Sequence, residues 1–173
     1  MHEGQPAPEE AEANASSVDV ETLDSDHRAA LELMEEICAA TGQEVRPVVR
    51  SIQPPYLHIE LVGDDVRATW GRMGHALDAL QLLANMILAR RIDTDVRLIL
   101  DADGYRERRA EALRERAREI AKEVKLRNEE AELEPLPPHE RRIIHTALAD
   151  DPDIQTYSEG DEPGRRVVIS PRR

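Results

Sequence analysis

An arginine and a histidine stand four residues apart near the carboxyl end of the chain, at Arg141 and His145. On an α-helix this spacing puts both side chains on one face. Arginine supplies a permanent cation with a planar set of donors, and histidine supplies a donor whose charge depends on pH. Such a pair suits a phosphate group or a stacked base better than it suits catalysis. The spacing leaves a second interpretation open, a polar helix face on which the histidine caps the helix or forms local hydrogen bonds.

More cations follow in a β-branched segment, residues 165–169, which opens with Arg165 and Arg166. Arg172 and Arg173 come just after it. A strand at this place, lying beside the helix, would join these arginines to the first pair in one positively charged surface. The candidate nucleic-acid contacts of this region are Arg141, His145, Arg165 and Arg166.

A second candidate site is the segment Gly71-Arg72-Met73-Gly74, which lies between two expected helices. Two glycines let a nucleic-acid backbone approach the main chain, and the amino terminus of the following helix favours phosphate. Arg72 adds a cation. The sequence therefore predicts RNA contacts at Gly71, Arg72, Met73 and Gly74, with a purely structural turn as the alternative.

Catalytic and metal-binding patterns do not fit the chain. His139 and His145 are six residues apart, whereas the helix of a zinc protease needs its histidines four apart. We find no P-loop and no serine nucleophile elbow. The single cysteine, Cys38, lies in a helical apolar pattern and is expected to be a small buried hydrophobic residue. We expect a protein that is not an enzyme and uses no metal or cofactor.

Periodicity predicts the elements that position the second site. Apolar spacing indicates helices at 27–41 and 75–91, and alternation indicates strands at 45–52, 56–62 and 95–100. In the second helix Leu83 and Met86 widen the apolar stripe, which predicts that it is well buried. With a short helical turn before Trp70, the order is that of a type II KH domain, residues 27–102.

Residues 103–173 have a different pattern. A long charged helix at 103–127 is followed by a connection with one short strand near Leu133, a helix at 138–149 and a hairpin of strands at 154–157 and 165–169. These elements predict a small α/β domain that carries the Arg-x-x-x-His motif. The expected fold class is α+β, with two small domains.

The net charge of -13 is concentrated at the amino terminus. Residues 1–26 hold eight acidic side chains and no Lys or Arg, which leaves -5 for the remainder. We expect this segment to be a disordered, solubilising tail, or one that competes with RNA for a basic surface. The scarcity of aromatic residues disfavours modules that read RNA by stacking on a sheet. No signal peptide or membrane span is recognisable, which predicts a soluble, cytoplasmic protein without membrane insertion.

Several of these segments together resemble one known family. Arg141 and His145, the downstream Thr156-Tyr157-Ser158-Glu159-Gly160 and the strand Arg165–Pro171 resemble the Arg-x-x-x-His nucleic-acid-binding domain of the bacterial Jag (SpoIIIJ-associated) family. Residues 71–81 resemble the KH loop and helix of the same family. The chain departs from the family pattern at Met73, where a second basic residue is usual, and at Ala68-Thr69-Trp70. The resemblance spans residues 27–173, with the acidic tail in place of the amino-terminal domain of many relatives.

The resemblance implies a non-catalytic protein that binds single-stranded RNA through two adjoining modules. It further implies post-transcriptional control linked to cell-envelope growth and division, a small KH protein as partner and an association with the YidC-type insertase. A protein adaptor with vestigial RNA binding is the alternative. Arg141, His145 and Arg166 match the family's nucleic-acid contacts. Because Met73 removes a cation from the loop, we expect the Arg141 and His145 face to contribute more of the affinity; single-stranded DNA as a ligand and the oligomeric state are left open.

Overall fold

The computed structural model describes residues 18–172 of the chain, which divides into two compact units, Met1–Tyr105 and Arg106–Arg173. Of the predicted acidic tail, residues 1–17 lie outside the described residues. The remainder of that segment carries structure, a 3-10 turn η2 (Val20–Thr22) and the start of the first helix at Ser25. Asp24 caps this helix, its Oδ1 accepting hydrogen bonds from the backbone N–H groups of Asp26 at 3.1 Å and His27 at 2.9 Å. Regular structure therefore begins before His27.

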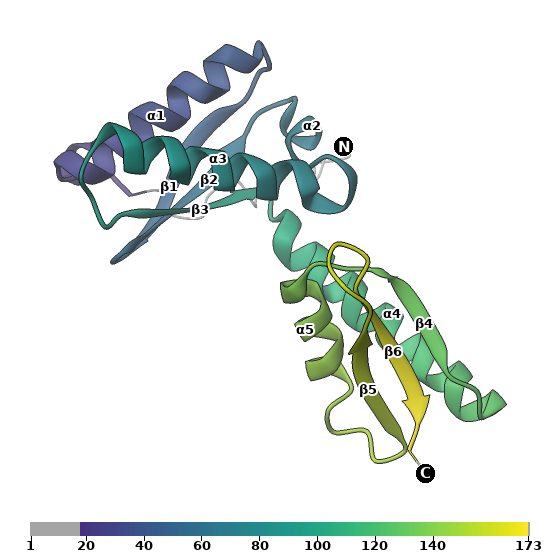
Figure 1. The fold of residues 1–173 in the computed structure, drawn as a ribbon. Coiled ribbons are helices and arrows are strands. Elements are labelled where there is room, and N and C mark those ends of the chain that lie inside the picture. Colours follow the sequence, from purple (N-terminus) through teal and green to yellow (C-terminus); the bar gives the residue numbers. More distant parts are fainter. Residues whose placement is uncertain (1–17, 173) are drawn as a thin grey trace, which may run out of the picture. The chain divides into compact units, whose positions relative to one another are not determined.

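The first unit contains the elements expected from the sequence, in the expected order (Figure 1). They are α1 (Ser25–Thr41), β1 (Arg46–Gln53), β2 (Tyr56–Val62), α2 (Val66–Trp70), η3 (Arg72–Gly74), α3 (His75–Arg91) and β3 (Arg97–Ala102). The strands form one sheet in the order β1-β2-β3, in which β1 and β2 are antiparallel and β2 and β3 are parallel.

Alternating side chains divide the faces of this sheet. On β2, Leu57, Ile59 and Leu61 are buried, whereas His58 and Glu60 on the opposite face are only partly buried. The buried face packs in one hydrophobic core with α1 and α3. Cys38 belongs to this core, as expected, and burial raises the pKa of its thiol.

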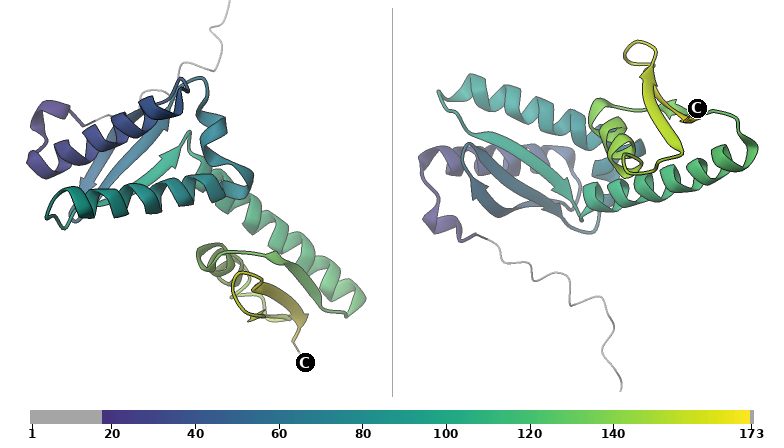
Figure 2. Two further views of the ribbon diagram at one scale, coloured as in Figure 1. Left: turned by 45° about the horizontal axis from the view of Figure 1, so that its top comes forward. Right: turned by 90° about the horizontal axis from the view of Figure 1, so that it is seen from below.

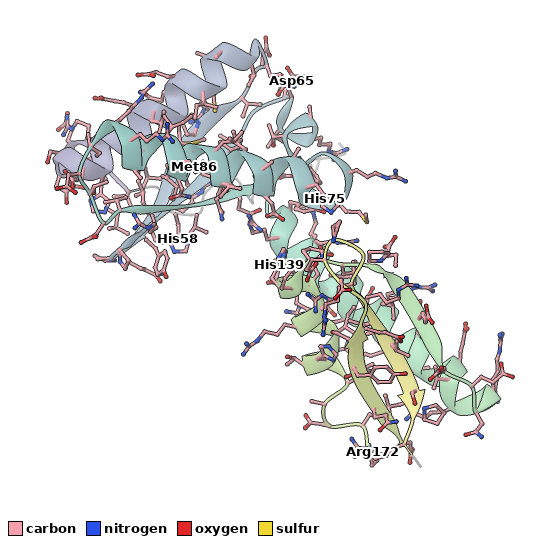
Figure 3. The ribbon with its side chains drawn as sticks, viewed as in Figure 1. His58, Asp65, His75, Met86, His139 and Arg172 are labelled. Carbon is pink, nitrogen blue, oxygen red and sulfur yellow. The ribbon has the colours of Figure 1, made fainter. Side chains whose placement is uncertain are left out.

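The prediction of a well-buried α3 is wrong. Leu77, Ala84 and Leu88 are buried against the sheet, but Leu83 and Met86 are 54% and 50% exposed. The exposed face, with Met86 labelled in Figure 3, consists of Leu82, Leu83, Met86 and Ile87. A helix that contacts a sheet on one side can bury only the stripe that faces it, whatever the hydrophobicity of its other residues.

The second unit also has the predicted elements, and its hairpin is confirmed (Figures 1 and 2). They are α4 (Tyr105–Arg127), β4 (Ala131–Pro135), α5 (Pro138–Ala147), β5 (Ile154–Glu159) and β6 (Arg166–Pro171). The antiparallel sheet has the order β4-β6-β5. Leu113, Ala117 and Ile144, from the two helices, share one core with Val167 and Ile169 of β6. Helix and strand mix in both units, and the fold class is α+β.

A buried ion pair joins the two helices of the second unit. Arg109 on α4 donates from Nε to Oε1 of Glu140 at 2.7 Å and from Nη2 to Oε2 at 3.0 Å. Glu140, on α5, is only 3% exposed. Bidentate geometry of this kind fixes the orientation of α5 as well as adding energy. None of the helices in residues 18–172 offers an apolar stretch of the length that crossing a bilayer needs.

Candidate nucleic-acid interface

Helix α5 carries the predicted pair. It begins at Pro138, a residue suited to the first helical turn because the N–H it lacks would have no partner inside the helix. Glu140 and Ile144 are its buried residues, and Arg141 and His145 follow them by one position each. Both are therefore set at the margin of the buried face, partly covered and partly open to solvent. His139, labelled in Figure 3, is exposed at the start of the helix.

Arg141 is held on both sides by its own unit. Its Nε donates to the backbone oxygen of Leu136 at 3.0 Å, and its Nη2 forms an ion pair with Oε1 of Glu162. The side chain is 11% exposed, against 52% for Glu162. The guanidinium is thus fixed in place and faces a carboxylate from the loop between β5 and β6.

His145 bonds to β5 through both ring nitrogens. Nδ1 lies 2.7 Å from Oγ1 of Thr156, and Nε2 lies 2.9 Å from Oγ of Ser158. Hydroxyl groups can donate or accept, so the neutral ring has both nitrogens satisfied. Burial, and next the charge of Arg141, lower the pKa of His145. The structure favours the local hydrogen-bonding interpretation, in which His145 fixes β5 against α5.

This arrangement makes stability depend on pH. Because the pKa of His145 is lowered by folding, the unfolded chain binds more protons below the ordinary histidine pKa of about 6.5. The stabilising contribution is complete above that pH and is lost as pH falls toward the folded pKa. We expect the loss of unfolding free energy between about pH 7.5 and about pH 5 to be smaller in His145→Gln than in the wild type. Urea unfolding at both pH values measures it, with His139→Gln as control, and an unchanged loss in His145→Gln would contradict it.

The two arginines at the start of β6 lie on opposite faces of the sheet. Arg165 donates from Nη1 to the oxygen of Gly160 at 2.9 Å and from Nη2 to that of Ser158 at 3.2 Å. Its own backbone oxygen accepts from the N–H of Leu136 at 3.1 Å, the residue whose carbonyl binds Arg141. Arg165 therefore adjoins Arg141 at the end of the hairpin.

Arg166 instead contacts Glu132 of β4, with Nη1 to Oε2 at 2.7 Å. It lies on the sheet face away from Val167 and the core, because side chains alternate along a strand. Arg172 follows the other end of β6, where its N–H bonds to the oxygen of Asp153 at 2.8 Å. The structure brings together Arg141, His145 and Arg165, and it does not bring Arg166 or Arg172 to them.

The outer face of the same sheet is acidic. Tyr157, 41% exposed, donates from its hydroxyl to Oε2 of Glu130 at 3.2 Å. Burial, followed by the charges of Glu130, Glu159 and Glu132, raises the pKa of Tyr157. Phosphate would be repelled there, so the edge formed by α5 and the β5–β6 loop is the better nucleic-acid surface of this unit.

The Gly71–Gly74 loop has a backbone that its glycines make possible. Gly71 and Gly74 have φ of 64° and 76°, and a Cβ on Gly71 would lie 2.6 Å from the Cβ of Ala76. A Cβ on Gly74 would lie 2.6 Å from Cε1 of Tyr105. Met73 also has a positive φ, 54°, although it carries a side chain. The glycines are thus required by packing as well as by conformation.

The same loop leaves its polar groups accessible. Gly74 is the N-cap of α3 and offers no side chain to its first N–H groups. Arg72 and His75 are exposed beside them, and His75 is labelled in Figure 3. Trp70 is half-buried, with its ring centroid 5.0 Å from that of Tyr105, so it packs at the edge of the core. The loop brings a cation and the N–H groups of a helix start together, as phosphate binding requires.

Several residues at these sites escaped the sequence analysis. Glu162, Thr156 and Ser158 contact the motif from positions 11 to 21 residues away. Strand alternation could have placed Thr156 and Ser158 on the helix-facing side of β5, but no signal identified Glu162. Within residues 18–172, no three His, Cys, Asp or Glu side chains are grouped so as to hold a metal ion.

Comparison with known proteins bears on both units. Residues 111–171 match the family model of the Arg-x-x-x-His domain. The chain is 38% identical to the RNA-binding protein KhpB of Clostridium symbiosum, over 83% of this chain and 65% of that protein. It is 33% identical to the protein of the same name from Bacillus subtilis, over 89% of this chain and 74% of that one. For the KhpB of Lactiplantibacillus plantarum, 39% identical, the match covers 32% of the relative.

The chain thus spans about two thirds of the first of these relatives and about a third of the last. The Bacillus subtilis match extends over most of both proteins, and the resemblance that the motifs suggested is confirmed. The protein belongs to the KhpB, or Jag, family, and its second unit contains an Arg-x-x-x-His domain.

Proposed function

We propose that this protein binds single-stranded RNA without catalysing a reaction, and that Arg141 provides the main phosphate contact. The observation that carries the proposal is the pairing of its fixed guanidinium with an anion at the edge formed by α5 and the β5–β6 loop. Arg165 adjoins it, and His145 keeps β5 in position. The names of the relatives, RNA-binding proteins, support the same ligand.

The first unit acts, in this proposal, as a type II KH domain. Its order of elements and its Gly71–Gly74 loop support that assignment. KH domains clamp about four nucleotides of backbone on such a loop. Here Arg72 and the first N–H groups of α3 would hold one phosphate, with Met73 in place of a second cation. The boundaries proposed for the two domains are residues 27–102 and 103–173.

Two modest sites on one chain can bind tightly together. Once one site holds an RNA strand, the other meets that strand at a high effective concentration, so the overall affinity exceeds either alone. Arg141 is held by two contacts before RNA arrives, whereas Arg72 is exposed on its loop. Less ordering of the side chain on binding favours the larger contribution from Arg141.

Binding of a labelled pool of single-stranded RNA at about 50 mM and about 200 mM salt tests the proposal. We expect salt-dependent binding by the whole chain, and Arg72→Glu should weaken it about three- to tenfold because it reverses a phosphate contact. The matched control is Arg90→Glu, an exposed arginine at the other end of α3. Equal losses in the two variants would contradict a role for the loop, and absence of binding at low salt would contradict the function.

In the cell, we propose post-transcriptional control linked to envelope growth and division, in the cytoplasm. A role as protein adaptor is the second candidate, and the exposed apolar face of α3 favours it (Leu82, Leu83, Met86 and Ile87). The partners proposed are the small KH protein and the YidC-type insertase. Crosslinking in cells discriminates between the candidates, since recovery of protein without RNA would favour the adaptor.

A further inference from the structure

We infer that the carboxylate of Glu162 occupies the phosphate position of the Arg141 site, and that an RNA phosphodiester must replace it there. The inference rests on the proposed RNA binding and adds a competitor built into the chain. It assigns to the β5–β6 loop a part in setting affinity.

The contacts of Arg141 explain why the two anions compete. Its Nε is taken by the backbone oxygen of Leu136 at 3.0 Å, and its Nη2 faces Glu162. With 11% of the side chain exposed, little guanidinium surface is open beyond the side that Glu162 covers. A phosphate that is to share charge-assisted hydrogen bonds with Nη2 must approach where the carboxylate lies.

Glu162 can leave without disturbing the hairpin. Its side chain is 52% exposed, so it can turn into water. The backbone around it is fixed independently, by the N–H of Gly164 bonding to the oxygen of Asp161 at 2.8 Å and by Arg165 bonding to Gly160 at 2.9 Å. Displacement therefore requires a change of side-chain rotamer and no unfolding.

The charges balance in the exchange. A carboxylate and a phosphodiester each carry one negative charge, so Arg141 keeps an anionic partner throughout. The advantage of RNA lies in its neighbouring phosphates, whose counterions are released when several contacts form together. A single small anion gains none of this, and Glu162 thereby disfavours isolated phosphates relative to a polynucleotide.

Glu162→Gln is the direct test, with Glu132→Gln as its matched control. Glu132 pairs with Arg166 at 2.7 Å and is 53% exposed, so both variants remove one half-exposed, arginine-paired carboxylate and change the net charge equally. We expect Glu162→Gln to raise affinity for the RNA pool about three- to fivefold, the range of a partly exposed ion pair. Glu132→Gln should stay within about twofold of the wild type.

The salt dependence provides a second readout. In Glu162→Gln the slope of log affinity against log salt should stay close to that of the wild type, because the number of phosphate contacts is unchanged. In the Arg141→Ala background, Glu162→Gln should raise affinity no more than Glu132→Gln does in the wild type. A gain that persists without Arg141 would show a general effect of charge and overturn the inference.

The outcomes separate the inference from the function on which it rests. Equal affinities of Glu162→Gln and Glu132→Gln, with wild-type RNA binding intact, overturn the competitor and leave RNA binding standing. Failure of wild type and Glu162→Gln alike to bind RNA at low salt overturns the proposed function itself. Urea unfolding of each variant confirms that the hairpin is retained.

Discussion

Replacing Arg141 with alanine is expected to weaken binding of single-stranded RNA by about tenfold or more. The change removes a charge-assisted hydrogen bond to phosphate, worth roughly 1.5–3 kcal/mol. It also releases Glu162 from its ion pair, which leaves a carboxylate beside the incoming backbone. Both effects act in the same direction, and titration of a labelled RNA pool measures their sum.

Arg142→Ala is the control for this experiment, because Arg142 is the next residue of α5 and is exposed. It removes the same charge from another side of the helix, and we expect a loss of about twofold at most. Arg141→Lys keeps the charge and loses the planar set of donors, so an intermediate affinity is expected. Equal losses for Arg141→Ala and Arg142→Ala would exclude a specific contact at Arg141.

Replacing Arg109 with alanine is expected to lower the free energy of unfolding of the second unit by about 3–5 kcal/mol. Glu140, 3% exposed, would lose both charge-assisted hydrogen bonds and remain as a buried charge without its cation. Since this pair fixes α5 to α4, the amides of β5 and β6 should exchange faster with solvent. Hydrogen exchange measured by mass spectrometry follows those peptides directly.

Arg116→Ala, on the same helix, should change stability by no more than about 0.5 kcal/mol. Arg116 is exposed, and its contact with Glu119 is a surface pair at 3.6 Å. The double variant Arg109→Met with Glu140→Leu should recover much of the loss, because it removes both charges together. A loss for Arg109→Ala as small as that for Arg116→Ala would show that the pair contributes little.

The geometry of the Gly71–Gly74 loop determines which substitutions can test it. Any side chain on Gly71 or Gly74 would approach Ala76 or Tyr105 within 2.6 Å, and both residues have positive φ. Such variants would disturb the fold together with any binding. Arg72 is exposed and can be changed without touching the core, which makes it the informative position.

Local periodicity was a reliable guide to the elements because short-range geometry governs it. The alternation of Leu57, Ile59 and Leu61 predicted β2 and its buried face, and the four-residue spacing of Arg141 and His145 placed them on one side of α5. Hydrophobicity was a poorer guide to burial on α3. Its Leu83 and Met86 are exposed, because burial depends on which other elements a helix face meets.

The sequence by itself determined the order of elements, the motif on α5 and the family of the protein, since each depends on residues close together in the chain. Only the tertiary structure decided the partners of that motif. It paired Arg141 with Glu162 and His145 with Thr156 and Ser158, and it separated Arg165 from Arg166 across the two faces of the sheet. These contacts form between segments that strand pairing and core packing bring together, and no local spacing encodes that approach.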